Sequence, residues 1–198
     1  PPGIPDVEGD YQKKTGDLFK EDLAQAKQLL AEGLKEEGLD KLSFTIVYNT
    51  NEGHKKIAEA VQDMWKKNLG IDVKLENVEF QVKIDREDAL DFEVSRAGWI
   101  GDYVDPMTFL DMFMSNSQQN DTGWKNADYD KYIAEAKATN DQAKRMVAMH
   151  KAEEILMKEL PIMPIYFYTK PYTAKPYVKG IYDIVNRYPQ LHFVDIEK

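Results

Sequence analysis

The sequence predicts a mixed α/β domain whose sheet is partly parallel, and three neighbouring segments carry that prediction. Residues 44–48 are dense in β-forming side chains, which is typical of a buried strand. Residues 52–68 follow with an apolar stripe at helical spacing, and residues 71–78 then alternate apolar and polar side chains as a half-buried strand does. A strand, a helix and a strand in succession form a βαβ unit, so we expect two parallel strands and a right-handed crossover.

The segment before this unit is predicted to be a loop followed by one helix. Residues 1–19 are rich in proline, glycine and aspartate, and we interpret their start as a connector within a longer chain. Residues 20–35 carry apolar side chains near helical spacing, with Asp17 as the expected cap and Gly38 as the end. Gly70 is placed to end the helix of the βαβ unit.

The stretch after the βαβ unit is the one around which we expect the chain to be organised. Residues 80–90 predict a short helix, and residues 92–98 predict a buried strand that runs into a turn. Asp105 precedes a proline, which disfavours helical angles and marks a stop. Charged and aromatic groups at the end of a strand are where α/β proteins place ligands, although solvated loop charges would give the same pattern. The groups at this turn are Arg96, Trp99, Asp102 and Asp105.

The C-terminal half is predicted to be helical first and β-rich at its end. We expect short or regular helices at 107–114, 126–138 and 141–159, with Pro161 ending the last one. The side chains of this last helix and of its end that we expect to face the core are Ala143, Met146, Val147, Met149, Ile155, Leu156 and Leu160. Residues 162–168 predict a strand whose prolines indicate an edge strand or a strand start. Residues 169–198 predict a β-rich tail with short runs at 172–177, 181–185 and 191–196.

Composition excludes several classes of function. The chain has 198 residues, a formal net charge of -9 and no cysteine. An acidic balance disfavours nucleic acid and anionic membranes as partners, because both require a basic face. Without cysteine there is no thiolate site, and His54, His150 and His192 are too far apart in sequence to predict zinc. We therefore expect no metal and no cofactor. No secretion signal, lipid-anchor motif or apolar run of roughly 18 residues is apparent.

The polar groups at the organising turn leave two chemistries open. Asp102 and Asp105 could be an acid/base pair of a hydrolase, although their spacing says little about their separation. Arg96 could clamp a carboxylate or form a structural ion pair with Glu93 or Asp91. No nucleophile elbow, phosphate loop or dinucleotide fingerprint accompanies them, so the pattern favours a binding site over a catalytic one.

Several motifs, taken together and in order, resemble the oligopeptide-binding proteins of bacterial ABC importers, which are extracellular solute-binding proteins of family 5. The motifs are Tyr48-Asn49-Thr50, His54-Lys55-Lys56, the run from Trp65 to Ile71, the run from Arg96 to Pro106, Thr122-Gly123-Trp124 and the run from Pro161 to Tyr166. The resemblance covers essentially the whole chain but only the C-terminal portion of the family's chain.

The resemblance implies a fold and a function. Members of the family close two lobes around an extended peptide, so residues 1–168 would form a periplasmic-binding-protein-like C-terminal lobe. Residues 169–198 would return to an absent N-terminal lobe. The implied protein is a monomeric, non-enzymatic binder that captures extracellular oligopeptides and delivers them to an ABC permease. It would be located in a periplasm or attached as a lipoprotein outside the membrane. Relatives specialised for dipeptides, nickel chelates, sugars or signalling peptides are alternatives.

The resemblance also implies roles for individual residues. Asp102 matches the aspartate that receives the α-ammonium group of the peptide, and Arg96 and His54 match positions that reach its carboxylate. Trp99 and Ile100 match a side-chain pocket, and Arg86 matches approximately another arginine that reaches the carboxylate. Strand addition would use the exposed backbone from Arg96 through Gly98 to Trp99. Asn49, at a strand end, is added as a residue that faces the cleft.

Overall fold

The computed structural model describes residues 1–182 and 189–197, and it divides the chain into two compact units. The sheet unit comprises Phe19–Gly98 and Asp121–Gly123. The helical unit comprises Pro1–Leu18, Trp99–Asn120 and Trp124–Lys198. The predicted boundary at residue 168 refers to lobes of a longer chain and stays a prediction.

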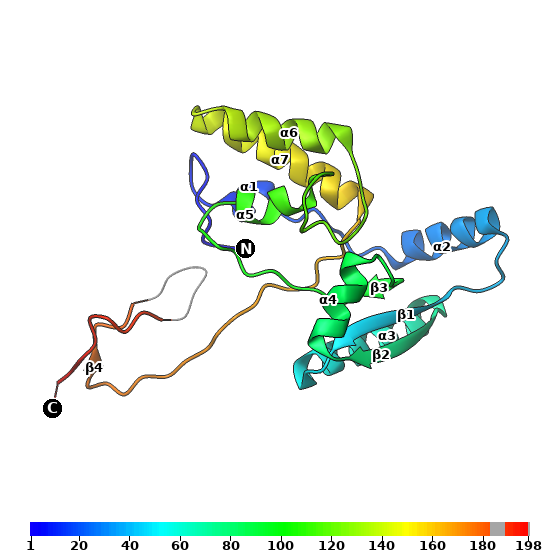
Figure 1. Cartoon of the computed structure of the whole chain (residues 1–198), viewed down its shortest axis with the longest axis horizontal. Helices are drawn as coiled ribbons and strands as arrows, with labels where there is room; N and C mark the ends of the chain where they lie inside the picture. Colours follow the sequence, from blue (N-terminus) through cyan, green and yellow to red (C-terminus); the bar gives the residue numbers. More distant parts are fainter. Residues whose placement is uncertain (183–188, 198) are drawn as a thin grey trace. The chain divides into compact units, whose positions relative to one another are not determined.

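The sheet unit is an α/β structure built on a three-stranded parallel sheet of order β2-β1-β3 (Figure 1). Its elements are α2 (Leu23–Glu37), β1 (Ser43–Asn49), α3 (Glu52–Leu69), β2 (Asp72–Val78), α4 (Phe80–Asp88) and β3 (Val94–Ser95). In register, Val47 of β1 is opposite Glu76 of β2 and Ser95 of β3. The predicted βαβ unit and its parallel strands are confirmed.

Helices cover both faces of this sheet because its strands alternate. Ile46 and Val73 point to α3 and pack with Val61 in one apolar cluster. The alternate side chains of the strands point to the opposite face, toward α4. Among them, Ser95 and Glu76 bond to side chains of that helix. Asn51 caps α3 by accepting from two backbone N–H groups, and Gly70 ends the helix in the left-handed region, as expected.

Two N-terminal expectations need correction. The segment 1–19 is not all loop, because α1 (Tyr11–Thr15) forms there and buries Tyr11. The cap of α2 is Asp22 and not Asp17, since the Asp22 side chain accepts from Gln25 N at 2.8 Å. A carboxylate can cap only from the position directly before the first turn, and Asp17 lies too far upstream.

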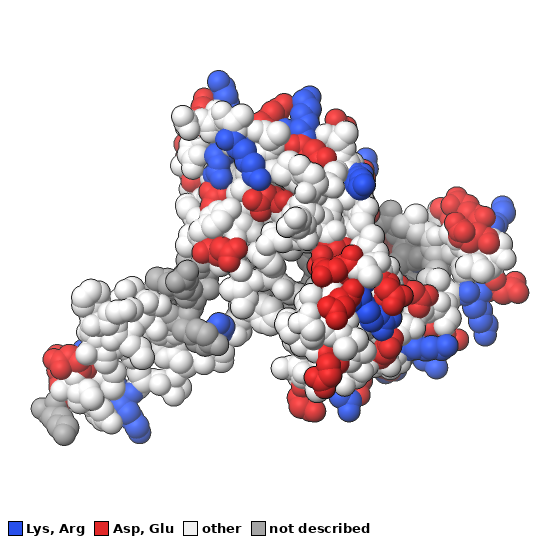
Figure 2. Space-filling view, in the orientation of Figure 1, with Lys and Arg blue, Asp and Glu red and all other residues white. Residues whose placement is uncertain are grey.

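The helical unit has its core around two adjacent helices. Its other helical elements are α5 (Met107–Leu110), the 3-10 turn η1 (Asp111–Phe113), α6 (Ala127–Ala138) and α7 (Gln142–Glu159). Tyr129, Ile133, Met149 and Leu156 are among its most deeply buried side chains. Acidic and basic side chains are interspersed over the outside of α6 and α7 (Figure 2). Ala143, Val147 and Leu160 were expected inside but are exposed, because the buried stripe of α7 follows Met146, Met149 and Leu156.

Predicted strands near the C-terminus are largely absent from the described residues. Residues 162–168 form no strand, and β3 has 2 residues where seven were expected. In the tail, β4 (Val178–Lys179) pairs antiparallel with β5 (Asp195–Ile196), and the predicted run 181–185 lies partly outside the described residues. Prolines remove the N–H groups that a ladder would need. Figure 2 shows few charges over this tail. The large exposed hydrophobic side chains include Met163, Ile165, Tyr166, Phe167 and Tyr168 in the segment before the tail, and Tyr172 and Tyr177 in the tail itself.

Candidate ligand-binding site

The carboxyl edge of the parallel sheet collects three of the predicted site residues. β1 ends at Asn49, and α3 begins just beyond it, which places His54 in the first turn of that helix. β3 runs parallel to β1 and leads directly into Arg96. Ligands of open parallel sheets bind at this edge, and the N-terminus of α3 adds a partial positive charge to it.

His54 is held by Asn49 and is half-buried. Its Nδ1 lies 2.9 Å from the Asn49 side-chain oxygen. Burial lowers the pKa of His54, and the charges of Arg96 and Lys83 lower it further. The ring is therefore neutral near pH 7. With Nδ1 donating to Asn49, Nε2 is then an acceptor, and it can donate to a carboxylate only when the ring takes up a second proton.

Arg96 has a fixed backbone, and the two carboxylates proposed as its structural partners are engaged elsewhere. Its N–H donates to the carbonyl of Val47 at 2.8 Å. Glu93 accepts from the backbone N–H of Thr45 at 2.8 Å, so it takes the place of a strand hydrogen bond. Asp91 pairs with Arg86 at 3.5 Å.

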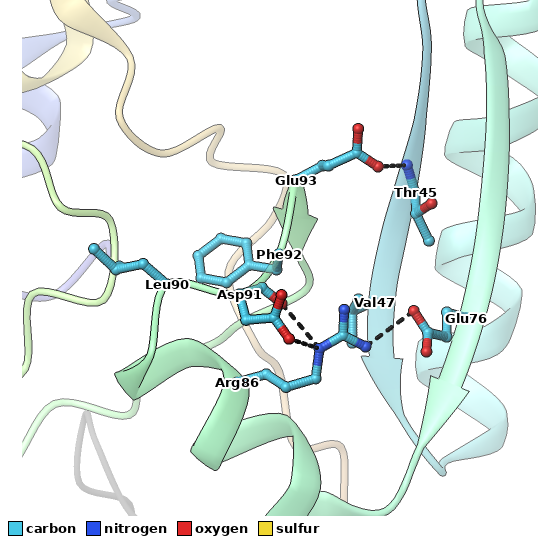
Figure 3. A pocket seen from close by; sticks show the side chains of 8 residues that line it. All are labelled: Thr45, Val47, Glu76, Arg86, Leu90, Asp91, Phe92 and Glu93. Atoms are coloured by element: carbon cyan, nitrogen blue, oxygen red, sulfur yellow. Dashed lines mark hydrogen bonds and ion pairs between the residues drawn. The ribbon is translucent and has the colours of Figure 1, made fainter.

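Arg86 lies in a hollow of about 380 Å³ beside the strands rather than at their carboxyl edge (Figure 3). Its guanidinium pairs with Glu76 at 3.0 Å and donates to the Asp91 carbonyl at 2.9 Å. The neighbouring carboxylates raise the pKa of Arg86, with the Glu76 hydrogen bond as the largest cause. Arg86 thus has internal partners, and its assignment to a ligand stays a prediction. The hollow is lined by Thr45, Val47, Glu76, Arg86, Leu90, Asp91, Phe92 and Glu93.

The remaining predicted residues follow β3 along the chain. Gly98 ends the long segment of the sheet unit, and Trp99 begins the second segment of the helical unit. The indole N–H of Trp99 is shielded from solvent and has no acceptor among the described residues, whereas Ile100 is exposed. A Cβ at Gly101 would meet Thr108 and Phe109 at 3.0 Å, so the turn approaches α5 closely.

Asp102 and Asp105 have different environments although they share one turn. The backbone N–H of Asp102 donates to the Thr108 hydroxyl at 2.9 Å, while its carboxylate is exposed and accepts no bond from the described residues. Both oxygens of Asp105 receive Arg145 at 2.7 Å, and Oδ1 also receives the N–H of Met107. Asp105 is therefore a structural group, and the two carboxylates do not form the acid/base pair of the hydrolase alternative.

Sequence reasoning missed a buried group of polar residues next to the site. Lys83 and Glu87 form a buried ion pair on α4, and Ser95 donates to the same carboxylate at 2.6 Å. A lysine and a glutamate four residues apart normally predict an exposed helix face, so the sequence carried no signal for this group. Across the described residues there is no cluster of three or more metal-ligating side chains, and no described helix is long and apolar enough to cross a bilayer.

Comparison with known proteins places the chain among solute-binding proteins. Residues 1–121 match the family model described as "Bacterial extracellular solute-binding proteins, family 5 Middle". The dipeptide-binding protein DppE of Bacillus subtilis is 44% identical over 182 residues, which are 91% of this chain and 34% of that protein. The chain spans about a third of the length of the curated relatives it matches.

Solved structures agree with this comparison. The Haemophilus influenzae OppA complex with the peptide RPPGFSPFR is 46% identical, with a TM-score of 0.73 over 81% of this chain and 32% of that one. The substrate-binding domain of an oligopeptide ABC transporter from Bacillus anthracis is 30% identical, with a TM-score of 0.86 over 100% of this chain and 40% of that one.

Proposed function

This chain belongs to family 5 of the bacterial extracellular solute-binding proteins, and from that premise we propose that it is the C-terminal portion of an oligopeptide-binding component of an ABC importer. The observation that carries the proposal is the difference between the two carboxylates of one turn. Asp105 is fully engaged by Arg145, while Asp102 presents an exposed carboxylate without a partner among the described residues.

The proposed site recognises what all peptides share. Asp102 receives the ammonium group, Arg96 receives the carboxylate, and His54 also receives it when its ring is protonated. The backbone from Arg96 to Gly98 adds a peptide strand. Trp99 and Ile100 line a side-chain pocket, and the unpaired indole N–H of Trp99 is a donor for a ligand carbonyl. A charged hydrogen bond in such a site contributes roughly 1.5–3 kcal/mol.

The site is proposed to bind without catalysing a reaction. A hydrolase needs a positioned base or nucleophile and a group that stabilises the developing charge. Asp105 is occupied by Arg145 and by a backbone N–H, so Asp102 has no carboxylate partner for acid/base work. A dipeptide is the second candidate ligand, favoured by the 44% identity to the B. subtilis dipeptide-binding protein.

The partner and location follow from the same proposal. The parent protein is a monomer that works outside the cytoplasmic membrane, in a periplasm or as a surface lipoprotein. It hands its ligand to the permease subunits of the importer. The family description as extracellular solute-binding proteins supports the location.

The test is the Asp102→Asn variant in the protein that carries this chain. We expect calorimetry to show at least about tenfold weaker binding of trialanine, because the peptide ammonium loses its counter-charge. N-acetyl-trialanine has no ammonium group, so its affinity should not respond to the variant. Asp128→Asn removes a carboxylate from α6 that is also exposed, and it is the matched control. Unchanged trialanine affinity in Asp102→Asn would remove the proposed role.

A further inference from the structure

Helix α4 buries charged side chains and leaves apolar side chains exposed. Its two buried side chains are Lys83 and Glu87, which are 4% and 5% exposed. Phe80, in contrast, is 61% exposed, and Val82 is also exposed. Amphipathic helices normally bury their apolar face and leave the charges in water. Core formation therefore does not explain why α4 buries its charged residues and exposes its apolar ones.

Helix stability does not supply that reason. The Lys83 Nζ to Glu87 Oε1 distance is 2.5 Å, and both side chains are withdrawn from water. Desolvating such a pair costs several kcal/mol, and well-packed apolar replacements are often neutral or stabilising. A lysine that precedes a glutamate is also the less favourable order along a helix. The pair therefore costs the fold stability, which points to a role in restraining the residue that bonds to it.

What the pair holds is the end of β3. Ser95 donates its hydroxyl to the same Glu87 oxygen at 2.6 Å. β3 has 2 residues, and the N–H that follows them, that of Arg96, donates to Val47. With so short a ladder, the bond from Ser95 to Glu87 is a main restraint on the chain immediately before Arg96. Lys83 in turn restrains Glu87 to one geometry.

We propose that Lys83, Glu87 and Ser95 are positioning residues that aim Arg96 at the terminal carboxylate of a bound peptide. The inference rests on the proposed function and deepens it, because it names the free carboxyl terminus as the group for which this network selects. None of the three touches the ligand. Their effect passes through the backbone of β3 to Arg96, beside His54 at the sheet edge. Lys83 also acts electrostatically on His54, whose pKa its charge helps to lower.

The experiment compares trialanine with its C-terminal amide, measured by calorimetry in the protein that carries this chain. Wild type is expected to prefer the free acid. In Ser95→Ala the preference should fall by at least about fivefold, through weaker binding of the acid while the amide is unaffected. Ser95→Thr keeps the hydroxyl and should restore the preference. Ser43→Ala, at the far end of β1, is the matched control and should change neither affinity.

Each outcome decides the inference. A selective loss for the free acid, rescued by threonine, supports positioning. Equal losses for acid and amide would mean a general structural role and overturn it. Glu87→Gln alone would strand the buried charge of Lys83, so the second variant combines it with Lys83→Met. The double variant keeps an oxygen for Ser95 but removes its charge, and it should show a smaller loss of the same kind. If wild type binds neither peptide, the proposed function itself fails; if wild type binds both equally, only the inference fails.

Discussion

The ion pair between Asp105 and Arg145 should be worth far more than the ion pair beside it on α7. Arg145 meets both oxygens of Asp105 at 2.7 Å, and the two side chains are only 18% and 22% exposed. Exposed pairs contribute about 0–1 kcal/mol, whereas breaking a fully buried pair costs about 3–5 kcal/mol. The Met107 N–H still satisfies Asp105 when Arg145 is removed. We therefore expect Arg145→Met to lower the free energy of unfolding by about 2–3 kcal/mol.

Urea denaturation, followed by circular dichroism, measures this cost, and Lys144→Met is its matched control. Lys144 pairs with Asp141 at 3.5 Å, but the two side chains are 79% and 46% exposed. Its loss should therefore change the free energy of unfolding by no more than about 0.5 kcal/mol. If the two variants are equally destabilised, or if Arg145→Met is neutral, the structural role of Asp105 is refuted. Asp105 would then be available as a carboxylate partner of Asp102.

Two further predictions concern the sheet unit. The pKa of His54 should lie below its ordinary value of 6.5, because burial and the Arg96 charge both lower it. Arg96→Met should therefore raise this pKa. An NMR titration of the ring in both proteins is the measurement, and an unchanged pKa contradicts the placement of Arg96. Gly70 has a φ of 70° and open space around it, so Gly70→Ala should cost about 1 kcal/mol through backbone strain alone. Gly33→Ala, inside α2 with equal space, should instead stabilise by about 0.5–1 kcal/mol in the same urea assay, and equal signs for the two variants would be inconsistent with this backbone account.

The parts of the fold that could be predicted from sequence are those with local causes. The βαβ unit was predictable because strand, cap, amphipathic helix and terminal glycine follow one another, from Phe44 through Asn51 to Gly70. Each signal acts over a few residues and agrees with the next. Local agreement of this kind is what makes a sequence specify one structure.

The errors arose where tertiary context decides. Val147 has the side chain of a core residue but lies on the outer side of α7, because α6 and α5 cover a different stripe. β3 is short because the side chain of Glu93 replaces a backbone partner, which no periodicity can show. The segment 162–168 has β-forming residues, but Pro161 and Pro164 cannot donate to a ladder.

The candidate site divides in the same way. Asn49, His54 and Arg96 could be placed together because parallel strands end at one edge. The difference between Asp102 and Asp105 could not be predicted, since Arg145 is forty positions away in the sequence and nothing marks it as the partner. Lys83 and Glu87 were hidden because spacing on a helix does not say which face is covered.

The short length of β3 has a consequence for how this protein could change over evolutionary time. The βαβ unit carries the seven-residue pairing of β1 with β2, from Ser43 to Val78, and this pairing does not involve the third strand. β3 is attached by few backbone bonds and by the side chains of Ser95 and Glu93. A few substitutions there could redirect the loop that we propose faces the ligand while the scaffold is inherited intact, so new ligand preferences can arise without a new fold.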